Sequence, residues 1–431
     1  MGTVSDGIVR VGVLGCGNVG GALVQLLGAD PDGLAARTGL RLEVTRVAVR
    51  NTAKERLVDL DEGCLTHDAE GVVNDPDVDV IVEVIGGIEP ARSLILAALK
   101  AGKPVVTANK ELLSNVGTEL VEAAANAGVD LLYEASVGGG IPLIRPLRES
   151  LAGEDITRVM GIVNGTTNYI LTKMTEDGAT YADALAEAQS LGYAERDPTA
   201  DVEGYDAGAK AAIIATIAFG VRIVAGDVYR EGISGVTAAD IAFAARLGYV
   251  VKLLAIAERE AGQVAVRVHP AMLPSSHPLA SVRDSFNAVF IEGQAVGELM
   301  FYGRGAGGLP TASAVLGDLI DAAHNLRAGG SGRAAPLAKA IIRPIDELRS
   351  QYYLNLTVDD QPGVLAAVAT VFGEHDVSIS EMKQEGLGGE ARLIFITHSA
   401  RERDIQATIH ALRQLDAVER IGSLLRVVGT E

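Results

Sequence analysis

Residues 8–20 read Ile-Val-Arg-Val-Gly-Val-Leu-Gly-Cys-Gly-Asn-Val-Gly, an apolar run that passes directly into a glycine-rich turn. The β-branched part is typical of a buried strand, and Gly15, Gly17 and Gly20 fill the spacing Gly-x-Gly-x-x-Gly. In this spacing the first glycine permits a tight turn, the second lets a pyrophosphate approach the backbone, and the third lets helix and strand pack closely. We therefore predict a dinucleotide-binding turn; the alternative is a glycine-rich turn without a ligand. The predicted contacts are Gly15, Gly17, Asn18, Val19 and Gly20.

Strands and helices alternate through the first third of the chain. We predict further strands at 44–49, 79–85, 104–107 and 130–133, and helices at 21–27, 90–101 and 117–127. Residues 28–40 are assigned to a loop, because the second strand ends farther from Gly20 than is usual. The alternation predicts an α/β fold with a Rossmann-like, doubly wound parallel sheet over residues 1–135. A helix is predicted at 309–327, and residues 310–345 are expected to pack back on this sheet.

Two further regions follow. Residues 136–309 contain the predicted helix 207–219 and the predicted strands 263–269 and 288–292, which indicates a mixed α/β domain. Residues 352–431 predict strand, helix, strand, strand, helix, strand. The ranges are 353–358, 363–374, 377–384, 390–397, 401–414 and 418–428. This βαββαβ order predicts a C-terminal ferredoxin-like domain.

The composition bounds the class of protein. The chain has 431 residues, 48% of them hydrophobic, which is enough for two or three domains. A net charge of −19 argues against nucleic acid or an anionic membrane as the main partner. No apolar run reaches membrane-spanning length, residues 1–6 lack the basic start of a signal peptide, and the two cysteines imply no disulfide framework. We expect a cytoplasmic protein.

The end of the second predicted strand indicates which dinucleotide binds. An NAD site usually has Asp or Glu there to hold the ribose hydroxyls, whereas this chain has Arg50. An arginine suits a 2′-phosphate, with Lys54 or Arg56 nearby, so we predict NADP and keep NAD as the alternative. A solvated surface arginine without a ligand is the plainer interpretation of Arg50.

The chemistry next to a nicotinamide depends on which nucleophiles and proton donors are available. A thioester route needs a nucleophilic cysteine, but Cys16 lies inside the glycine turn and Cys64 lies in an expected surface stretch. This favours interconversion of a carbonyl with an alcohol or an amine, and carbonyl reduction requires a proton donor. Lys110 follows a predicted strand, at the sheet edge where ligands collect, although it could equally begin a surface helix. Lys210 is the second candidate.

The candidate Lys210 ends a charged stretch, residues 192–210. Asp206 and Lys210 are four residues apart on a predicted helix and would share one face. Such a pair can transfer a proton or can be an ordinary surface ion pair. Asp197-Pro198 favours the first interpretation, because proline fixes the approach to the helix and holds the upstream acids in a set loop.

Over the whole chain these segments resemble the homoserine dehydrogenase family. The most specific match is Ala188-x-x-x-Gly192-Tyr193-x-x-x-Asp197-Pro198-x-x-Asp201-Val202-x-Gly204-x-Asp206-x-x-x-Lys210. Shorter segments that also match are residues 107–110, 133–142, 164–169 and 303–307.

The resemblance implies NAD(P)-dependent interconversion of L-homoserine and L-aspartate 4-semialdehyde in threonine, methionine and isoleucine biosynthesis. It makes residues 136–309 the catalytic and dimerisation domain. The implied catalytic residues are Lys210, as proton donor, with Lys110 and Asp206. The implied substrate ligands are Glu195, Asp201 and Lys210, and Gly307 joins Lys110 at the cofactor. Carboxylates suit the ammonium group of such a substrate, and lysines suit its carboxylate.

The resemblance also implies a monovalent cation, expected to be sodium. Its ligands would be main-chain oxygens of Glu134, Val137, Gly139 and Ile141. Hard cations prefer oxygen ligands. A plain turn that supports the active site is the alternative.

The last domain resembles an ACT domain, and residues 359–365 (Asp-Asp-Gln-Pro-Gly-Val-Leu) resemble its ligand loop. We expect L-threonine as effector, with a dimerisation module that binds no ligand as the alternative. The family implies a homodimer or homotetramer. Two other functions stay open for the whole chain. One is another dehydrogenase of amino-acid-like substrates, and the other is a non-catalytic amino-acid sensor on the same scaffold.

Overall fold

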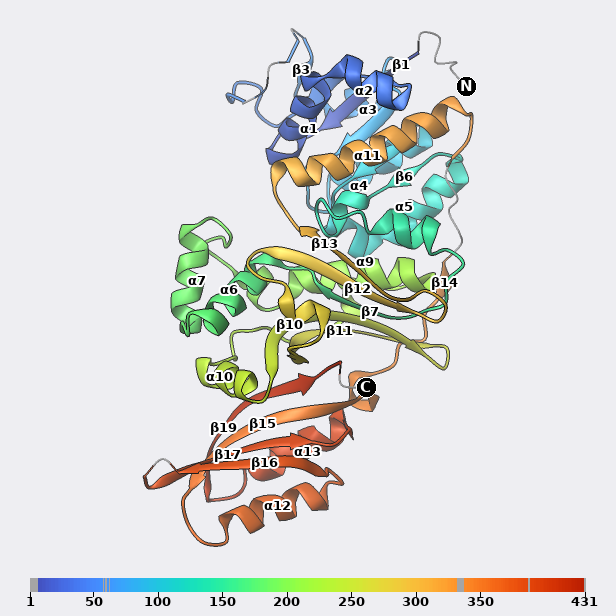
Figure 1. The fold of residues 1–431 in the computed structure, drawn as a ribbon. Coiled ribbons are helices and arrows are strands. Elements are labelled where there is room, and N and C mark those ends of the chain that lie inside the picture. Colours follow the sequence, from blue (N-terminus) through green and yellow to red (C-terminus); the bar gives the residue numbers. More distant parts are fainter. Residues whose placement is uncertain are drawn as a thin grey trace. The chain divides into compact units, whose positions relative to one another are not determined.

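The computed structural model describes residues 7–56, 58, 60–61, 63–331, 337–386 and 388–429 (Figure 1). By contacts the chain forms two compact units that interleave along the sequence. Unit 1 comprises Met1–Val159, Ala209–Asp227 and Asn287–Ala340, and unit 2 comprises Met160–Gly208, Val228–Phe286 and Ile341–Glu431. The three-part division expected from the sequence stays a prediction.

Unit 1 contains a six-stranded parallel sheet in the order β3-β2-β1-β4-β5-β6. Its strands are β1 (Ile8–Leu14), β2 (Arg41–Ala48), β3 (Leu65–Thr66), β4 (Val80–Glu83), β5 (Val105–Thr107) and β6 (Leu131–Leu132). The order reverses between β1 and β4, which creates the crevice where such sheets bind nucleotides. The predicted Rossmann-like fold is confirmed.

Helices cover both faces of this sheet. Val9, Val11 and Val13 of β1 are fully buried in one core with α1 (Asn18–Ala29) and α11 (Gly308–Arg327). The opposite core joins β4 and β5 to α3 (Ala69–Asn74), α4 (Ala91–Lys100) and α5 (Lys110–Ala127). Figure 1 shows α11, in orange, lying beside α1. Helix α11 therefore packs against a sheet whose first strand lies 294 residues earlier, counted from Leu14 to Gly308.

Residues 28–40 are not a loop, as expected from the sequence, but contain α2 (Pro31–Thr38). Only Leu34 of this helix is buried, so its apolar signal is weak. Its ends are set by capping: Asp30 accepts a hydrogen bond from Gly33 N at 2.9 Å, Pro31 opens the first turn, and Gly39 closes the last at φ 71°. The extra residues between β1 and β2 thus form one more surface helix.

Unit 1 also holds elements from later in the chain. These are the larger part of α9 (Tyr205–Phe219), β8 (Val221–Arg222), β12 (Phe286–Gly293), β13 (Gly297–Arg304) and β14 (Ala338–Lys339). Helix α9 and strand β7 (Ile156–Ile162) each cross the boundary between the units.

Unit 2 is built on the antiparallel pair β10 (Tyr249–Glu260) and β11 (Gln263–Pro274), paired along all twelve residues. Around it lie α6 (Gly165–Glu176), α7 (Tyr181–Ser190), α8 (Thr199–Val202), β9 (Tyr229–Arg230) and α10 (Ala238–Arg246). Strand β9 runs parallel to β11, with Arg267 opposite Tyr229.

The C-terminal part of unit 2 has the predicted βαββαβ order. Its elements are β15 (Arg349–Asp359), α12 (Val364–Glu374), β16 (Ile379–Gly386), β17 (Glu390–Thr397), α13 (Glu402–Leu412) and β19 (Val418–Val427). The strands align as β19-β15-β17-β16, and both helices share one core with them. Strand β19 also pairs with β11, with Ala271 opposite Arg426. The ferredoxin-like sheet therefore continues the sheet of β10 and β11.

Candidate active site

Gly15 and Gly20 make the tight turn and the close helix packing that their spacing predicts. Gly15 has φ 103°, and a β-carbon there would lie 2.8 Å from the carbonyl oxygen of Val84. A β-carbon on Gly20 would overlap the carbonyl oxygen of Gly15, so only glycine lets α1 approach β1 this closely. Around Gly17 nothing lies within 4 Å of such a carbon, which leaves this position open to an incoming group. Gly17 is also the N-cap of α1, where free amides favour phosphates.

Gly307 lies at the start of α11, and this helix begins against the same turn. A β-carbon on Gly308 would lie 2.9 Å from the carbonyl oxygen of Asn18 and 3.6 Å from Cβ of Ala22. Gly307 itself is the N-cap of α11. The structure thus brings the segment 303–307 to the glycine turn.

Arg50 and Lys54 are exposed and follow the carboxyl end of β2. Arg56 shapes the loop between them: its guanidinium donates to the carbonyl oxygens of Lys54 and Asn51, each at 2.6 Å. Arg56 also lies beside the thiol of Cys16 and acts to lower the pKa of that thiol, while burial, the larger effect, raises it. Three basic side chains therefore follow β2, and Arg56 lies next to the glycine turn.

Neither cysteine is suited to nucleophilic catalysis. Cys64 does not lie on the surface, as expected from its sequence context, but is only 4% exposed and belongs to the core of the parallel sheet. Burial is the main cause that raises the pKa of both Cys16 and Cys64, which lowers the thiolate fraction. A thioester route is therefore still disfavoured. For Cys64 the reason is burial in the core rather than a position on the surface.

Lys110 is the first residue of α5, directly after β5. The helix begins earlier than the predicted residue 117, because Asn109 caps it by accepting a hydrogen bond from Leu112 N at 3.1 Å. The Asn109 amide also donates to the carbonyl oxygen of Gly87 at 2.7 Å. These bonds hold Lys110 at the carboxyl edge of the sheet, where ligands of such folds bind.

A buried carboxylate that the sequence reasoning missed ties the same edge together. Glu83 is fully buried at the end of β4 and accepts hydrogen bonds from the Thr107 hydroxyl at 2.6 Å and from Ile85 N at 2.8 Å. Its sequence context, a single acid in the apolar run Val-Ile-Val-Glu-Val-Ile, could have identified it, because an unpaired charge is not tolerated in a core. Glu83 fixes the ends of β4 and β5 relative to each other.

In unit 2, two acids of the charged stretch meet on one asparagine. The side-chain nitrogen of Asn164 donates to Asp201 at 2.7 Å and to Asp206 at 2.9 Å. The oxygen of the same amide caps α6 by accepting from Thr167 N at 2.8 Å. Asn164 comes from the segment 164–169, so two separate family-like segments form one polar cluster.

Glu195 is placed differently. Its side chain is exposed, and its main-chain oxygen accepts a hydrogen bond from the Gln189 amide at 3.0 Å. Nearby, Thr166 donates to the carbonyl oxygen of Tyr193 at 2.7 Å, and the rings of Tyr169 and Tyr193 are 4.9 Å apart. The start of α6 and the end of α7 are thereby joined, which fixes the backbone beside Glu195.

Asp206 and Lys210 lie one turn apart on α9, and each is 9% exposed. A solvated i,i+4 ion pair would leave both side chains in water. Their burial argues against that interpretation, and the proton-transfer role stays a prediction.

The turn expected to hold a cation is buried and tightly tied within unit 1. The Glu134 carboxylate accepts three main-chain hydrogen bonds, from Leu143, Ile144 and Arg145, at 2.5–2.7 Å. Its own main-chain N–H donates to Asp318 of α11 at 2.7 Å. Burial raises the pKa of Asp318 to about 7, against the opposing effects of the Glu134 N–H and Arg145.

The fit of this turn to a monovalent cation rests on its carbonyl groups. Gly138 and Gly139 are left-handed, at φ 74° and 58°, and bend the chain between Val137 and Ile141. The Glu134 carbonyl oxygen accepts a long bond of 3.5 Å from Val137 N. Buried main-chain oxygens on a curved segment suit a hard cation. Among the described residues no group of three or more His, Cys, Asp or Glu side chains could hold a metal ion.

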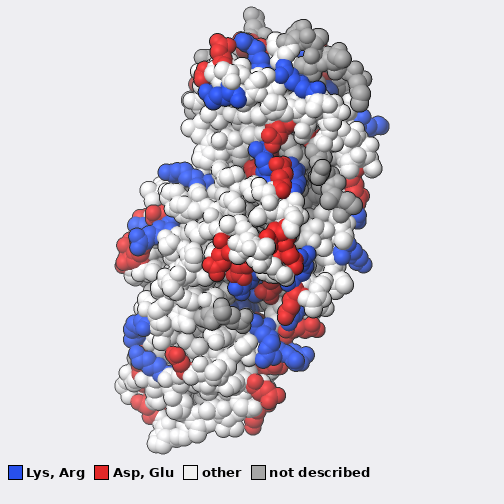
Figure 2. Space-filling view, turned by 45° about the vertical axis from the view of Figure 1, so that its right-hand side comes forward, with Lys and Arg blue, Asp and Glu red and all other residues white. Residues whose placement is uncertain are grey.

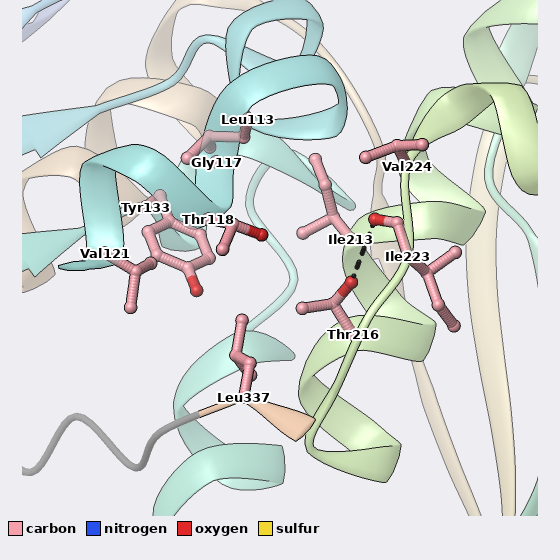
Figure 3. A pocket seen from close by; sticks show the side chains of 10 residues that line it. All are labelled: Leu113, Gly117, Thr118, Val121, Tyr133, Ile213, Thr216, Ile223, Val224 and Leu337. Atoms are coloured by element: carbon pink, nitrogen blue, oxygen red, sulfur yellow. Dashed lines mark hydrogen bonds between the residues drawn. The ribbon is translucent and has the colours of Figure 1, made fainter. Parts of the chain in front are cut away.

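An apolar cavity of about 30 Å³ lies elsewhere in unit 1, and Figure 3 shows its lining. Leu113, Thr118 and Val121 of α5 face Ile213 and Thr216 of α9, and the Thr216 hydroxyl donates to the carbonyl oxygen of Ile223 at 3.2 Å. None of the predicted site residues lines it, so it is packing space rather than the predicted active site.

The surface drawn in Figure 2 mixes acidic and basic side chains and presents no broad basic field. Within the part of the chain that the structure describes, every helix is too short or too polar to cross a membrane.

Three models of known protein families match along the chain. Residues 15–134 match the family model "Homoserine dehydrogenase, NAD binding domain", residues 142–320 match "Homoserine dehydrogenase", and residues 352–417 match "ACT domain". A homoserine dehydrogenase of Mycobacterium tuberculosis is 51% identical over an alignment of 434 positions, which covers 98% of this chain and 98% of that one.

Solved structures give the same result. The crystal structure of a homoserine dehydrogenase from Thiobacillus denitrificans superposes with a TM-score of 0.92 at 41% identity, covering 97% of this chain and 98% of that one. A hyperthermophilic archaeal homoserine dehydrogenase in complex with NADPH superposes with a TM-score of 0.61 at 30% identity, covering 73% and 98%. From these matches, the chain belongs to the homoserine dehydrogenase family, the NAD(P)-dependent oxidoreductases that act on the CH–OH group of homoserine.

Proposed function

We propose that this chain reduces L-aspartate 4-semialdehyde to L-homoserine, and the reverse, with Lys210 delivering the proton to the carbonyl oxygen. The observation that carries the proposal is the burial of Lys210 one turn after Asp206 on α9. Burial strengthens the interaction of an ammonium group with an oxygen that gains charge. The nicotinamide cofactor supplies the hydride when bound.

The acids hold the other end of the substrate in this proposal. Asp201 and Asp206 share the Asn164 amide, which fixes the distance between the two carboxylates. Two fixed carboxylates suit the single ammonium group of an amino-acid substrate. Glu195, which is exposed, completes the set, and Lys110, at the sheet edge, is the residue next to the cofactor.

NADP is the proposed cofactor. Arg50 and Lys54 are exposed at the end of β2, where a ribose 2′-phosphate would lie, and no acid occupies that position. The archaeal relative was solved with NADPH. The turn of residues 134–141 is proposed to hold a monovalent cation, sodium, through the main-chain oxygens of Glu134, Val137, Gly139 and Ile141, which would stiffen the segment that follows β6.

L-Threonine is the proposed effector. The predicted ligand loop, residues 359–365, lines a cavity of about 360 Å³ together with Gln384 and Leu393. Asp359 and Asp360 offer carboxylates to an ammonium group, and the free amides at the start of α12 offer donors to a carboxylate. Calorimetry tests this assignment. We expect Asp360→Asn to lose threonine binding, and Asp346→Asn, which lies outside the cavity, to keep it.

Association as a homodimer or homotetramer in the cytoplasm completes the proposal. The ACT sheet ends at β16, where most residues are exposed, and an exposed strand edge can pair with a second copy.

The experiment is an assay of the purified chain with NADPH and aspartate 4-semialdehyde. Consumption of NADPH that depends on the semialdehyde is expected, and homoserine should form in equal amount. A chain that binds L-threonine but consumes no NADPH would be the amino-acid sensor instead. Turnover of other amino-acid aldehydes in preference to this one would indicate a different dehydrogenase.

A further inference from the structure

An ionic cluster centred on a buried arginine joins the ACT sheet to the segment that supports the substrate acids. It consists of Arg426, Glu231, Glu402 and Tyr352, and we call it the Arg426 cluster. Arg426 is 1% exposed on β19 and donates to both oxygens of Glu402 at 2.7 and 2.8 Å. It also donates to both oxygens of Glu231 at 2.8 and 2.9 Å. The established reaction uses none of these residues.

Glu231 is the only member of the Arg426 cluster that precedes β10 in the chain. Burial would raise the pKa of its carboxyl, but the hydrogen bonds and charge of Arg426 outweigh burial, so the pKa is lowered. The hydroxyl of Tyr229 also donates to Glu231. This two-bond fork from the Arg426 guanidinium fixes Glu231 more tightly than a single lysine could.

The backbone around Glu231 lies directly against residues 202–208. Ile233 N donates to the carbonyl oxygen of Val202 at 2.8 Å. A β-carbon on Gly232 would overlap that same oxygen, and one on Gly204 would lie 3.4 Å from the carbonyl oxygen of Glu231. The backbone of residues 231–233 therefore packs so closely on residues 202–204 that Gly232 has no room for a side chain.

The preceding residue makes a second contact with the same stretch. The Arg230 guanidinium lies over the Tyr205 ring, 4.7 Å from its centroid, and the Arg230 side chain lies 2.7 Å from where a β-carbon of Gly208 would be. Residues 230–233 thus hold residues 202–208 from two sides. Of the two acids that share Asn164, Asp201 immediately precedes this held stretch and Asp206 lies within it.

Strand β15 connects the Arg426 cluster to the predicted effector loop, residues 359–365. Tyr352 of β15 donates to Glu402 at 3.0 Å and lies opposite Arg426 in the ladder of β15 and β19. The same strand ends at Asp359, in the wall of the 360 Å³ cavity. Seven residues of extended strand span about 23 Å. A shift of β15 at the loop would therefore move Tyr352 relative to Arg426 and Glu402.

From these contacts we propose that Glu231, held by Arg426, is a positioning residue: it sets the place of the substrate acids and transmits the state of the ACT sheet to them. The positioning part rests on the proposed substrate role of Asp201 and Asp206, and the transmission part rests in addition on the proposed L-threonine site. Spatial adjacency alone does not establish coupling, so the proposal is tested through energetic coupling.

The test uses the full-length chain and three variants. Glu231→Gln removes one charge but keeps hydrogen-bonding atoms. In this variant Arg426 still has Glu402 as its charged partner. Arg426→Lys keeps the charge and loses the fork. Glu385→Gln is the matched control, because it breaks the 2.9 Å ion pair of Arg246 and Glu385. Like the Arg426 cluster, this pair links the ACT sheet to another part of unit 2, here α10. It does not involve residues 229–233. Unfolding midpoints are recorded for all.

We expect Glu231→Gln and Arg426→Lys to raise KM for homoserine by about tenfold with KM for NADP⁺ within about twofold, and the double variant to be no worse than either single variant. Glu385→Gln should match the wild type. The proposal is overturned if the variants lower the unfolding midpoint while KM for homoserine stays unchanged, or if the two effects add fully.

L-Threonine separates the two parts. With Glu231→Gln, calorimetry should show threonine binding within about twofold of wild type, while the concentration for half-inhibition rises at least about tenfold. If inhibition is unchanged although threonine binds, transmission through Glu231 is wrong. If the wild type neither binds nor responds to threonine, the effector assignment is wrong, and the KM measurements still decide the positioning role.

Discussion

At the scale of single residues, the proposed mechanism depends on the amine of Lys210. Lys210 is buried, whereas Lys110 is partly exposed at the start of α5. We expect Lys210→Ala to lower kcat at least about a thousandfold, within the range attributed to a positioned acid or base. The unfolding midpoint should change far less than kcat. Initial rates with homoserine and NADP⁺ provide the measurement, and Lys100→Ala, at an exposed lysine of α4, is the control. Unaltered turnover would remove Lys210 from the mechanism.

Arg50 carries the prediction on cofactor choice. Arg50→Ala should weaken NADPH binding about tenfold, because a charged hydrogen bond to the 2′-phosphate is lost, and should leave NADH binding within about twofold. Fluorescence titration with both cofactors measures this. Arg37→Ala, at an exposed arginine of α2, should affect neither. An equal loss for both cofactors would mean that Arg50 does not contact the 2′-phosphate.

Lys252 gives a prediction on pH. It is 3% exposed on β10 and donates to the Asn168 oxygen at 3.0 Å and to the carbonyl oxygen of Val282 at 2.5 Å. Burial is the main cause that lowers its pKa to about 8, from 10.5. Because the folded pKa is lowered, the unfolded chain binds more protons between these pH values, and the free energy of unfolding rises with pH there.

The wild type should therefore gain up to about 3 kcal/mol relative to Lys252→Met as the pH rises from about 8 to about 10.5. Urea unfolding at both ends of that window measures the difference. Lys100→Met is the control and should show no such trend. A constant difference between wild type and Lys252→Met would show that Lys252 titrates normally.

At the scale of elements, the junction of β1 and α1 can be dissected with three alanines. Gly20→Ala should cost about 1–3 kcal/mol of stability, because its β-carbon overlaps the carbonyl oxygen of Gly15. Gly21→Ala, one position later with nothing within 4 Å, should be neutral or stabilise the helix by up to about 1 kcal/mol. Thermal unfolding of the free protein separates the two.

Gly17→Ala should behave differently from both. The space around Gly17 is empty, so stability should hardly change, yet NADP⁺ should bind at least about tenfold more weakly because the methyl group occupies the pyrophosphate approach. Normal NADP⁺ affinity in Gly17→Ala would contradict the assignment of the turn.

Elements with a strong local signal were predictable from the sequence, and elements made by capping were not. β1 and β17 have the predicted bounds because their apolar runs end at turn residues. α2 has one buried leucine and therefore almost no apolar periodicity, and its sequence signal lies in its caps. The same holds for the early start of α5: Asn109 is the signal, rather than an apolar pattern.

At the scale of the whole molecule, the family and its site segments could be inferred from the sequence, but the contacts that hold them could not. Arg426 and Glu231 are 195 residues apart, and no local pattern pairs them. A single arginine inside Leu-Leu-Arg-Val-Val does signal a buried partner. The burial of Cys64 was likewise invisible, because it follows from packing of the β2–β3 segment into the sheet core.

The most direct measurement is a crystal structure of the full-length chain with NADP⁺ and L-homoserine bound. We predict Nζ of Lys210 within about 3.2 Å of the homoserine hydroxyl oxygen, which is hydrogen-bond reach for proton transfer, and the ammonium group on Asp201 and Asp206. A homoserine hydroxyl that faces another proton donor, with Lys210 out of reach, would contradict the mechanism.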